Sequence, residues 1–440
     1  MDNKIATGNQ LWEHAKKIIP GGNQLLSKRS EMFLPGGWPS YFEKAKGCEV
    51  WDKSGKHYYD FAQMGVGSCI LGFADPDVND AVIEAVRNGS MSSLNSYEEV
   101  ELAEKLIDLH PWAEMVRFAR TGGEACAIGV RIARAASGKD KVAFCGYHGW
   151  HDWYLSANLA DDSNLDGQLL PGLVPKGVPR SLKGTALPFS YNKLEELKDI
   201  QSKYGQELGV IIVEPQRGHK PEPGFLEGVR RIADETGAVL IFDEITSGFR
   251  MNVGGIHLTM DVEPDMALFG KALGNGFPIA AIIGKKSIMD VAQESFISST
   301  FWTERIGFTA ALETLRKMEA HNIPEYLMKY GSQINRGWHM LAKRHGLDIK
   351  ISGIPPLTHL DFDYPNGSEI QTLYTQQMLE KGYLLGASVY TTYAYTEDII
   401  QQFIDDSGGV FLQISEALKN GDVKQRLKGP VKHSGFKRLT

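Results

Sequence analysis

Cysteines are few in this sequence, and its apolar runs are short. The four cysteines show no C-x-x-C spacing, so we predict neither a disulfide framework nor a zinc site; they are Cys48, Cys69, Cys126 and Cys145. Apolar runs such as Val210–Val213 and Ile279–Ile283 are far too short to span a membrane. The first residues, MDNKIATGNQ, lack the apolar core of a signal peptide. We therefore expect a cytoplasmic protein with no membrane partner.

The sequence also has no excess of basic charge, with 47 lysines and arginines against 54 acidic residues. The formal net charge of the 440 residues is −7, and no block of lysine and arginine stands out. This balance argues against a nucleic-acid-binding protein. Gly65-Val66-Gly67 is not followed by a further glycine at the spacing of a G-x-G-x-x-G turn, which argues against an NAD-linked dehydrogenase. With 42% hydrophobic residues, a chain of this length can bury a large core.

What the sequence does contain is a lysine set between an apolar run and several glycines. Met266–Phe269 has the composition of a short buried strand, and Lys271 follows it in a glycine-rich segment that ends at Pro278. Backbone without side-chain bulk lets a flat ligand approach closely. A lysine in partly apolar surroundings can act as a nucleophile toward a carbonyl group. Lys271 is therefore a candidate catalytic residue.

Two apolar runs upstream of this lysine end in carboxylates. Val210–Val213 precedes Glu214, and Val239–Phe242 precedes Asp243. The intervening residues leave room for a crossover helix, so we predict successive βαβ units of a parallel sheet. Such sheets bind ligands at the carboxyl ends of their strands. A buried aspartate facing a ring nitrogen, with a lysine that forms a Schiff base with an aldehyde, is the arrangement that pyridoxal phosphate requires.

Three segments together resemble the class III aminotransferases, and most of all their glutamate-1-semialdehyde 2,1-aminomutase branch. The segments are VIIVEP (210–215), LIFDEITSGFR (240–250) and PDMALFGKALGNGFP (264–278). The resemblance runs from about residue 17 to about residue 420. It implies an α/β protein of the fold type I class of pyridoxal-phosphate-dependent transferases. Such proteins have a large domain with a mostly parallel sheet of the seven-stranded type, flanked by helices, and a smaller α+β domain.

The resemblance also implies the domain organisation and the assembly. We expect residues 1–60 to form an N-terminal arm and hairpin that belong to the small domain. Residues 61–320 would form the large cofactor-binding domain, and residues 321–440 the rest of the small domain. Active sites of this family form at a dimer interface, so we expect at least a homodimer.

Residues around the cofactor follow from the same resemblance. Lys271 would bind pyridoxal 5'-phosphate as a Schiff base, and Asp243 would keep the ring nitrogen protonated. The cofactor would carry the amino group as pyridoxamine 5'-phosphate. Tyr147 and Ile245 would lie on the two faces of the ring. Glu214 would lie near its hydroxyl edge.

The cofactor phosphate is expected at the start of a helix. Thr121, Gly122 and Gly123 precede a helix predicted over residues 125–136, and a helix N-terminus favours an anion. Relatives have Ser-Gly-(Ser/Thr)-Glu here, so Gly123 replaces a hydroxyl-bearing residue and leaves more of the binding to backbone N–H groups and Thr121. Helix capping by Thr121 is the alternative interpretation. In relatives, a threonine at the position of Thr300 reaches the phosphate of the partner subunit.

The sequence departs from the aminomutase branch on the substrate side. The usual Gly-Thr-(Leu/Phe)-Ser-Gly-Asn-Pro is replaced by Ser299–Arg305, which brings Trp302 and Glu304 to positions of small residues. An arm after Pro-Gly-Gly carries Arg29, the best match to an arginine that grips a substrate carboxylate in relatives. A surface arm that crosses a subunit boundary is the alternative for this segment.

These departures favour an aminotransferase that moves an amino group from an amino acid, possibly glutamate, to a polar oxo substrate. An intramolecular aminomutase of the glutamate-1-semialdehyde type is the alternative, since it would use the same residues. A non-catalytic relative is a distant third interpretation, because Lys271 and Asp243 are both present. No metal site is predicted, since His148 and His151 have no set of thiols or carboxylates near them in the sequence.

Overall fold

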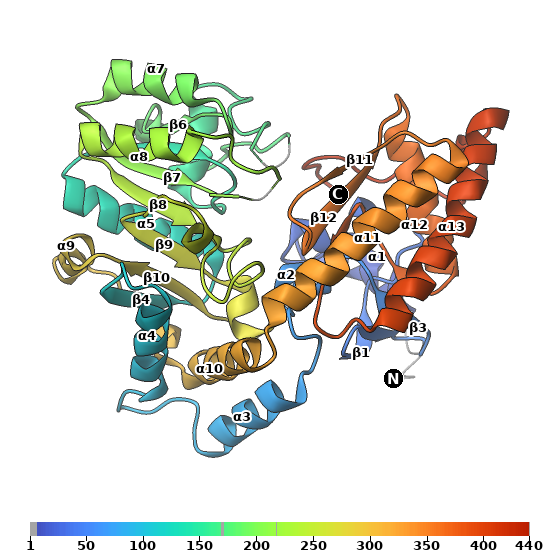
Figure 1. Ribbon diagram of the computed structural model, residues 1–440, viewed down its shortest axis with the longest axis horizontal. Coiled ribbons are helices and arrows are strands. Elements are labelled where there is room, and N and C mark those ends of the chain that lie inside the picture. The colour runs from blue at the N-terminus through green and yellow to red at the C-terminus, as the bar shows by residue number, and fades with distance from the viewer. Residues whose placement is uncertain (1–6, 169–170, 217, 440) are drawn as a thin grey trace. The chain divides into compact units, whose positions relative to one another are not determined.

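The computed structural model describes residues 7–168, 171–216 and 218–439 (Figure 1). The chain forms two compact units. One unit is Pro76–Glu325, and the other combines Met1–Asp75 with Tyr326–Thr440. The domain boundaries predicted after residues 60 and 320 stay predictions, whereas the change between the compact units falls after residues 75 and 325.

The larger unit is built on a seven-stranded sheet with the strand order β4-β10-β9-β8-β7-β5-β6. Its strands are β4 (Met115–Ala119), β5 (Lys141–Cys145), β6 (Ala186–Pro188), β7 (Leu208–Val213), β8 (Val239–Asp243), β9 (Met266–Phe269) and β10 (Ala280–Gly284). In the described sheet, β10 runs antiparallel to both of its neighbours, β4 and β9, and the other neighbouring strands pair in parallel. The predicted α/β fold with a mostly parallel seven-stranded sheet is confirmed.

Helices cover both faces of this sheet (Figure 1). The helices of the larger unit are α3 (Pro76–Arg87), α4 (Glu98–Leu109), α5 (Gly122–Ser137), α6 (Asp152–Leu155), α7 (Leu194–Tyr204), α8 (Phe225–Thr236), α9 (Lys286–Met289) and α10 (Arg305–Ala320). Along β5, Val142 and Phe144 join the core under α5, whereas Ala143 and Cys145 join the core under α8. This alternation explains why the central strands are apolar throughout, because both of their faces are buried.

β6 lies at the edge of the sheet, where it pairs in parallel with β5. One expectation about the larger unit needs correction. Helix α5 begins three residues before the predicted start, at Gly122. The reason is that Thr121, which precedes the two glycines, is the residue that caps the helix.

The smaller unit contains two short sheets. The first has the order β1-β2-β3-β13 and the second β11-β12-β14. Their strands are β1 (Phe42–Lys46), β2 (Glu49–Asp52), β3 (His57–Asp60), β11 (Ile349–Ser352), β12 (Leu357–Phe362), β13 (Tyr383–Leu384) and β14 (Ser388–Tyr390). Strands β2 and β3 pair antiparallel and form the predicted hairpin.

The helices of the smaller unit are α1 (Gly8–Ile18), α2 (Met64–Gly67), α12 (Gly367–Glu380) and α13 (Glu397–Asn420), while α11 (Ile323–His345) spans the boundary at residue 325. Helix α13 has Thr396 as its N-cap. Within the described ranges, no helix is long and apolar enough to cross a membrane.

Candidate active site

Three predicted site residues stand at the ends of neighbouring strands. Glu214 follows β7, Asp243 ends β8, and Lys271 comes two residues after β9. Since β7, β8 and β9 are adjacent and parallel, their carboxyl ends lie at the same edge of the sheet. Because each of these strands is an apolar, buried run, the two carboxylates and the amine that end or follow them lie together at this edge of the sheet.

The backbone at Lys271 is in an uncommon conformation. Its φ is +41°, in the left-handed region that non-glycine residues rarely adopt. Lys271 opens the short 3₁₀ turn η6 (Lys271–Gly274), and its Nζ donates a hydrogen bond to Thr246 Oγ1 at 2.8 Å. Such strain persists where the surrounding structure holds it, and it clusters at functional sites. Thr246 was not among the residues predicted from the sequence.

Asp243 is almost fully buried, with 4% of its surface exposed, and is held by three donors. His148 Nδ1 lies 2.7 Å from Oδ2, and Cys126 Sγ lies 3.3 Å from the same oxygen. The backbone N–H of Ile245 donates to Oδ1 at 3.1 Å. Burial, and after it the charge of Asp243, raises the pKa of the Cys126 thiol well above its ordinary value. The thiol therefore stays protonated and donates to the carboxylate.

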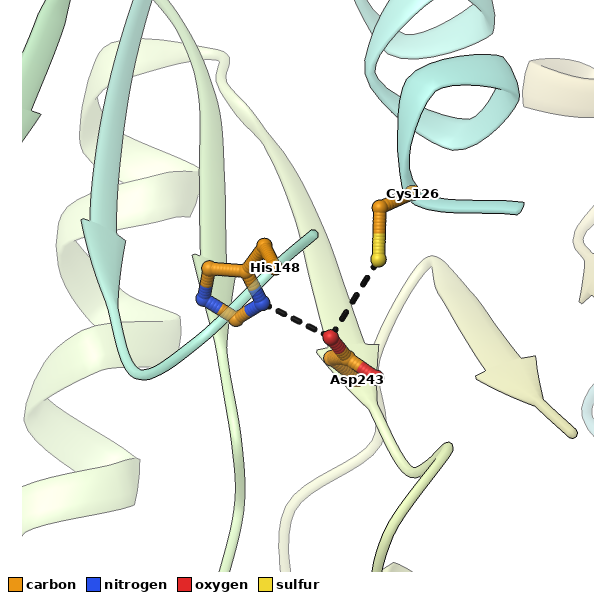
Figure 2. Close-up of side chains that lie close together, drawn as sticks. All are labelled: Cys126, His148 and Asp243. Atoms are coloured by element: carbon orange, nitrogen blue, oxygen red, sulfur yellow. Dashed lines mark hydrogen bonds and ion pairs between the residues drawn. The ribbon is translucent and has the colours of Figure 1, made fainter. Parts of the chain in front are cut away.

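His148 is buried with an oxygen atom facing each of its ring nitrogens. Nδ1 faces Asp243 Oδ2, and Nε2 lies 3.2 Å from the carbonyl oxygen of Cys145. The thiol, imidazole and carboxylate atoms of Cys126, His148 and Asp243 lie within 4.8 Å of one another, as ligands of a metal ion could. The sequence shows no set of thiols and carboxylates near His148, whereas the fold brings Cys126 and Asp243 to it (Figure 2).

The N-terminus of α5 offers an anion site in the same unit. Thr121 Oγ1 accepts from the backbone N–H of Glu124, and the Glu124 carboxylate accepts from that of Thr121 at 2.9 Å. This capping box confirms that Thr121 caps the helix. A Cβ added at Gly122 would lie 3.0 Å from the side chain of Ile245, and one at Gly123 would lie 3.3 Å from the ring of His151. The small residues therefore keep a space that larger ones would fill.

His151 lies beside Gly123, at the N-terminus of α5. Its Nδ1 is buried and has no hydrogen-bond partner in the described part of the chain. Burial lowers the pKa of His151 below its ordinary value. A buried polar atom without a partner beside a helix N-terminus is satisfied when an anion with hydrogen-bonding oxygens occupies that place. The residues present thus fit a phosphate at α5 and a protonated ring nitrogen at Asp243.

The residues predicted to flank the ring are half-buried. Ile245 lies two residues after Asp243. Its side chain would be 3.0 Å from a Cβ added at Gly122 and 3.5 Å from one added at Gly270. The backbone N–H of Tyr147 donates to Glu214 Oε2 at 3.2 Å. Glu214 thereby connects the end of β7 with the segment that follows β5.

The altered segment after Ser299 is tied to the start of α5 by one arginine. Arg120 donates to the carbonyl oxygens of Phe301, Trp302 and Glu304. Glu304 also caps α10 by accepting from the N–H of Ile306 at 2.7 Å. These contacts fix the course of the segment and do not test a contact with substrate, so the substrate roles predicted for Trp302 and Glu304 stay predictions. Thr300 opens the exposed 3₁₀ turn η8 (Thr300–Thr303).

Arg29 lies in the smaller unit and is engaged by the C-terminal segment. Its Nη1 donates to the carbonyl oxygen of Lys437 at 3.0 Å, and its guanidinium carbon lies 5.7 Å from the centre of the Phe436 ring. The predicted contact between Arg29 and a substrate carboxylate stays a prediction.

Comparison with known proteins identifies relatives over nearly the whole chain. The family profile described as Aminotransferase class-III matches residues 36–396. A 3-aminobutyryl-CoA aminotransferase from Cloacimonas acidaminovorans (strain Evry) is 33% identical over 420 residues, which cover 91% of this chain and 97% of that protein. A 2'-deamino-2'-hydroxyneamine transaminase from Streptomyces kanamyceticus is 31% identical over 329 residues, covering 74% and 79%.

Solved structures share the fold. The PLP internal aldimine form of the FumI protein from Sphingopyxis sp. MTA144 has a TM-score of 0.85 to this chain at 24% identity. The match covers 94% of this chain and 97% of that one. At 24% identity this likeness shows the fold alone. The family is shown by the profile match and by the two sequence relatives.

Proposed function

Because the chain belongs to the class III aminotransferase family, it is a pyridoxal-phosphate-dependent transaminase, and we propose that Lys271 is the lysine of its active site. The observation that carries this proposal is the meeting of Lys271, Asp243 and Glu214 at one edge of the sheet. An amine there can bind an aldehyde, and a buried carboxylate beside it can hold a protonated ring nitrogen.

Asp243 has the surroundings that this role needs. When bound, pyridoxal phosphate withdraws electrons from the substrate carbon that carries the amino group. A carboxylate buried without donors would be costly, but Asp243 accepts hydrogen bonds from His148, Cys126 and Ile245. Their positions fix the plane of the carboxylate. We infer that Asp243 presents a fixed negative charge to the ring nitrogen and keeps it protonated.

The phosphate contacts are assigned to the start of α5. The backbone N–H groups of Gly122 and Gly123 open the helix, and the helix dipole favours a negative charge there. Thr121 supports this site mainly as the cap that fixes the first turn. His151 Nδ1 would supply a further polar atom on the same side.

Tyr147, Ile245 and Glu214 complete the pocket in this proposal. Tyr147 and Ile245 would hold the ring between an aromatic and an aliphatic face and so orient the bond that breaks. Glu214 would lie at the hydroxyl edge of the ring. Its bond to the N–H of Tyr147 links these two residues, so that a shift of one moves the other.

We propose a homodimer in which Thr300 of one protomer contacts the phosphate bound by its partner. Large apolar side chains are exposed close to Thr300 in the sequence and just before α4. Phe296 is 89% exposed, Phe301 66% and Leu94 82%. Covering such side chains is favourable, at about 25 cal/mol per Å² of apolar surface. A cytoplasmic location remains part of the same proposal.

The substrate is proposed to be a polar oxo compound, with an amino acid such as glutamate as the donor. The names of the two sequence relatives favour intermolecular amino transfer over an aminomutase reaction. Their different substrates leave the identity of the acceptor to experiment. Arg29, Trp302 and Glu304 are the residues through which we expect the acceptor to be selected.

Reduction with borohydride tests the assignment of Lys271. The protein is loaded with pyridoxal phosphate, reduced, digested and analysed by mass spectrometry. We expect a stable cofactor adduct on the peptide that contains Lys271, and none in Lys271→Ala treated in parallel. An adduct on another lysine, present equally in both proteins, would overturn the assignment.

A further inference from the structure

The amine of Lys271 is held by Thr246, which lies in the loop after β8. Lys271 Nζ donates to Thr246 Oγ1 at 2.8 Å, and Thr246 is 8% exposed. The contact joins the segment after β8 to the segment after β9. Thr246 lies three residues after Asp243, so the same loop approaches both the proposed ring-nitrogen site and the proposed lysine.

We propose that Thr246 is a positioning residue that holds the Lys271 amine at the reacting carbon during proton transfer. The proposal rests on the proposed role of Lys271. A lysine that shuttles a proton is alternately an ammonium and a neutral amine. A hydroxyl group can accept a hydrogen bond from the first and donate one to the second. The proton that Lys271 takes from the substrate carbon passes on to the cofactor carbon, so Lys271 and Thr246 end as they began.

The hydrogen bond to Thr246 fixes the end of the Lys271 side chain, which its backbone conformation alone does not fix. With φ at +41°, the lysine backbone is held in a sparsely populated region at some cost in free energy. The side chain has four rotatable bonds, and a fixed backbone does not determine where its end lies. A hydrogen bond from Nζ to a buried hydroxyl limits that freedom. Correct placement of a reacting group within a few tenths of an ångström is what such contacts supply.

Thr246 is itself fixed by a buried network, which we call the Glu244 clamp. Glu244 is fully buried, and its carboxylate accepts from the N–H of Ile256 at 2.6 Å and from the N–H of His257 at 3.0 Å. It also accepts from His257 Nδ1 at 2.5 Å. The indole of Trp112 donates to His257 Nε2 at 2.9 Å. This bond makes Nε2 the acceptor and Nδ1 the donor of a neutral ring.

The Glu244 clamp closes the loop that carries Thr246. The loop begins after β8, which ends at Asp243. The hydrogen bond from the N–H of Ile256 to the Glu244 carboxylate joins the start of the loop to its far end. Inside the loop, Arg250 Nε donates to the carbonyl oxygen of Thr246 at 2.7 Å. Buried charges with several donors of fixed geometry rigidify their surroundings. The loop therefore presents the Thr246 hydroxyl to Lys271 from a rigid base.

Three single variants of the holoenzyme test the proposal. Thr246→Val keeps the shape of the side chain and removes the hydroxyl, whereas Thr246→Ser keeps the hydroxyl. Thr259→Val is the matched control, because the Thr259 hydroxyl lies beyond the Glu244 clamp and donates to the nearby carbonyl oxygen of Ile256 at 2.7 Å. Thermal unfolding of each variant shows whether the fold is kept.

Two stopped-flow readouts are compared. The first is the rate at which hydroxylamine displaces Lys271 from the bound cofactor, followed by absorbance, which requires no knowledge of the natural substrate. The second is the single-turnover rate with L-glutamate, L-alanine and 3-aminobutyrate, each with and without deuterium on the carbon that carries the amino group. We expect Thr246→Val to slow the first rate about tenfold or more and, with any donor that reacts, to raise the isotope effect. Thr246→Ser and Thr259→Val should stay within about threefold of the wild-type rates.

The proposal is overturned if folded Thr246→Val reacts with hydroxylamine as fast as Thr259→Val does. It is also overturned if Thr246→Ser is as slow as Thr246→Val, because the effect would then follow shape and not the hydroxyl. Failure of the proposed function gives a different result. In that case borohydride leaves no adduct on Lys271 in the wild-type protein, whatever residue stands at position 246.

Discussion

At the level of single residues, the site depends on contacts between residues that are far apart in the sequence. Cys126 and His148 both reach Asp243, although they lie on α5 and after β5. Nothing in the local sequence pattern around Asp243 identifies these partners. The apolar run that ends at Asp243 predicts its burial, and burial in turn requires donors, but which residues supply them is decided by the packing of α5 on the sheet.

Gly149 is the single residue at which we predict the sharpest effect on cofactor binding. Its φ is +99°, and a Cβ there would lie 2.8 Å from the Cα of Gly123, in the proposed phosphate site. Gly89 has a similar φ of +95° but open space around its Cβ position. Gly89→Ala should therefore cost only the strain of the backbone, about 1–2 kcal/mol of unfolding free energy. Gly149→Ala should cost more and should weaken cofactor binding at least about tenfold.

Denaturant unfolding and fluorescence titration with pyridoxal phosphate measure these two quantities. Equal cofactor affinities for the two alanine variants would contradict the proposed place of the phosphate. Equal losses of stability would show that the close approach of Gly149 to Gly123 carries no energetic weight.

At the level of helices and strands, the sequence predicts more. The runs that became β7, β8 and β9 are continuous and apolar, which is typical of strands buried on both faces. Their ends therefore located Glu214, Asp243 and Lys271 at one edge. The loop 244–257 was beyond prediction, because the Glu244 clamp joins residues whose side chains meet only after the loop has folded. Thr246 was missed for the same reason.

Two threonine N-caps, one on α5 and one on α13, allow the effect of a cap on stability to be separated from its effect on cofactor binding. Thr121 caps α5 and Thr396 caps α13, each by accepting a backbone N–H three residues on. Either threonine replaced by alanine should cost about 1 kcal/mol of unfolding free energy. Thr121→Ala should also raise the dissociation constant for pyridoxal phosphate several-fold, since the first turn of α5 is the proposed phosphate site. Thr396→Ala should leave that constant unchanged, and an equal effect of both would contradict the assignment.

At the level of the whole molecule, the fold class was predictable from the sequence. The alternation of buried strands and helices between residues 115 and 284 indicates an α/β sheet. The compact units change after residues 75 and 325, and α11 runs through the second of these points. A continuous helix carries no linker composition, so sequence alone gives no signal for a boundary inside it.

The stability of the larger unit should fall in mild acid through His110. Burial lowers the pKa of His110 from 6.5 to about 4, and the neutral ring accepts the N–H of Gly255 at Nε2. The unfolded chain therefore binds more protons than the native one between these values. The stabilisation is complete above pH 6.5 and is lost as the pH falls toward 4, by up to about 1.4 kcal/mol per pH unit.

Urea unfolding at several pH values compares the wild type with His110→Gln, whose side chain keeps an amide oxygen to accept the Gly255 N–H. We expect a shallower loss of stability between pH 6.5 and pH 4 in the variant. Parallel curves for the two proteins would contradict the contribution of His110.

The most direct test of the central claim is the absorption spectrum of the purified protein after incubation with pyridoxal phosphate and removal of the excess. We predict a band of lysine-linked cofactor in the wild type and none in Lys271→Ala. Addition of L-glutamate without an acceptor should convert this band to the colourless aminated cofactor, with release of 2-oxoglutarate. A wild-type protein that retains no cofactor, or a Lys271→Ala variant that shows the same band, would contradict the account.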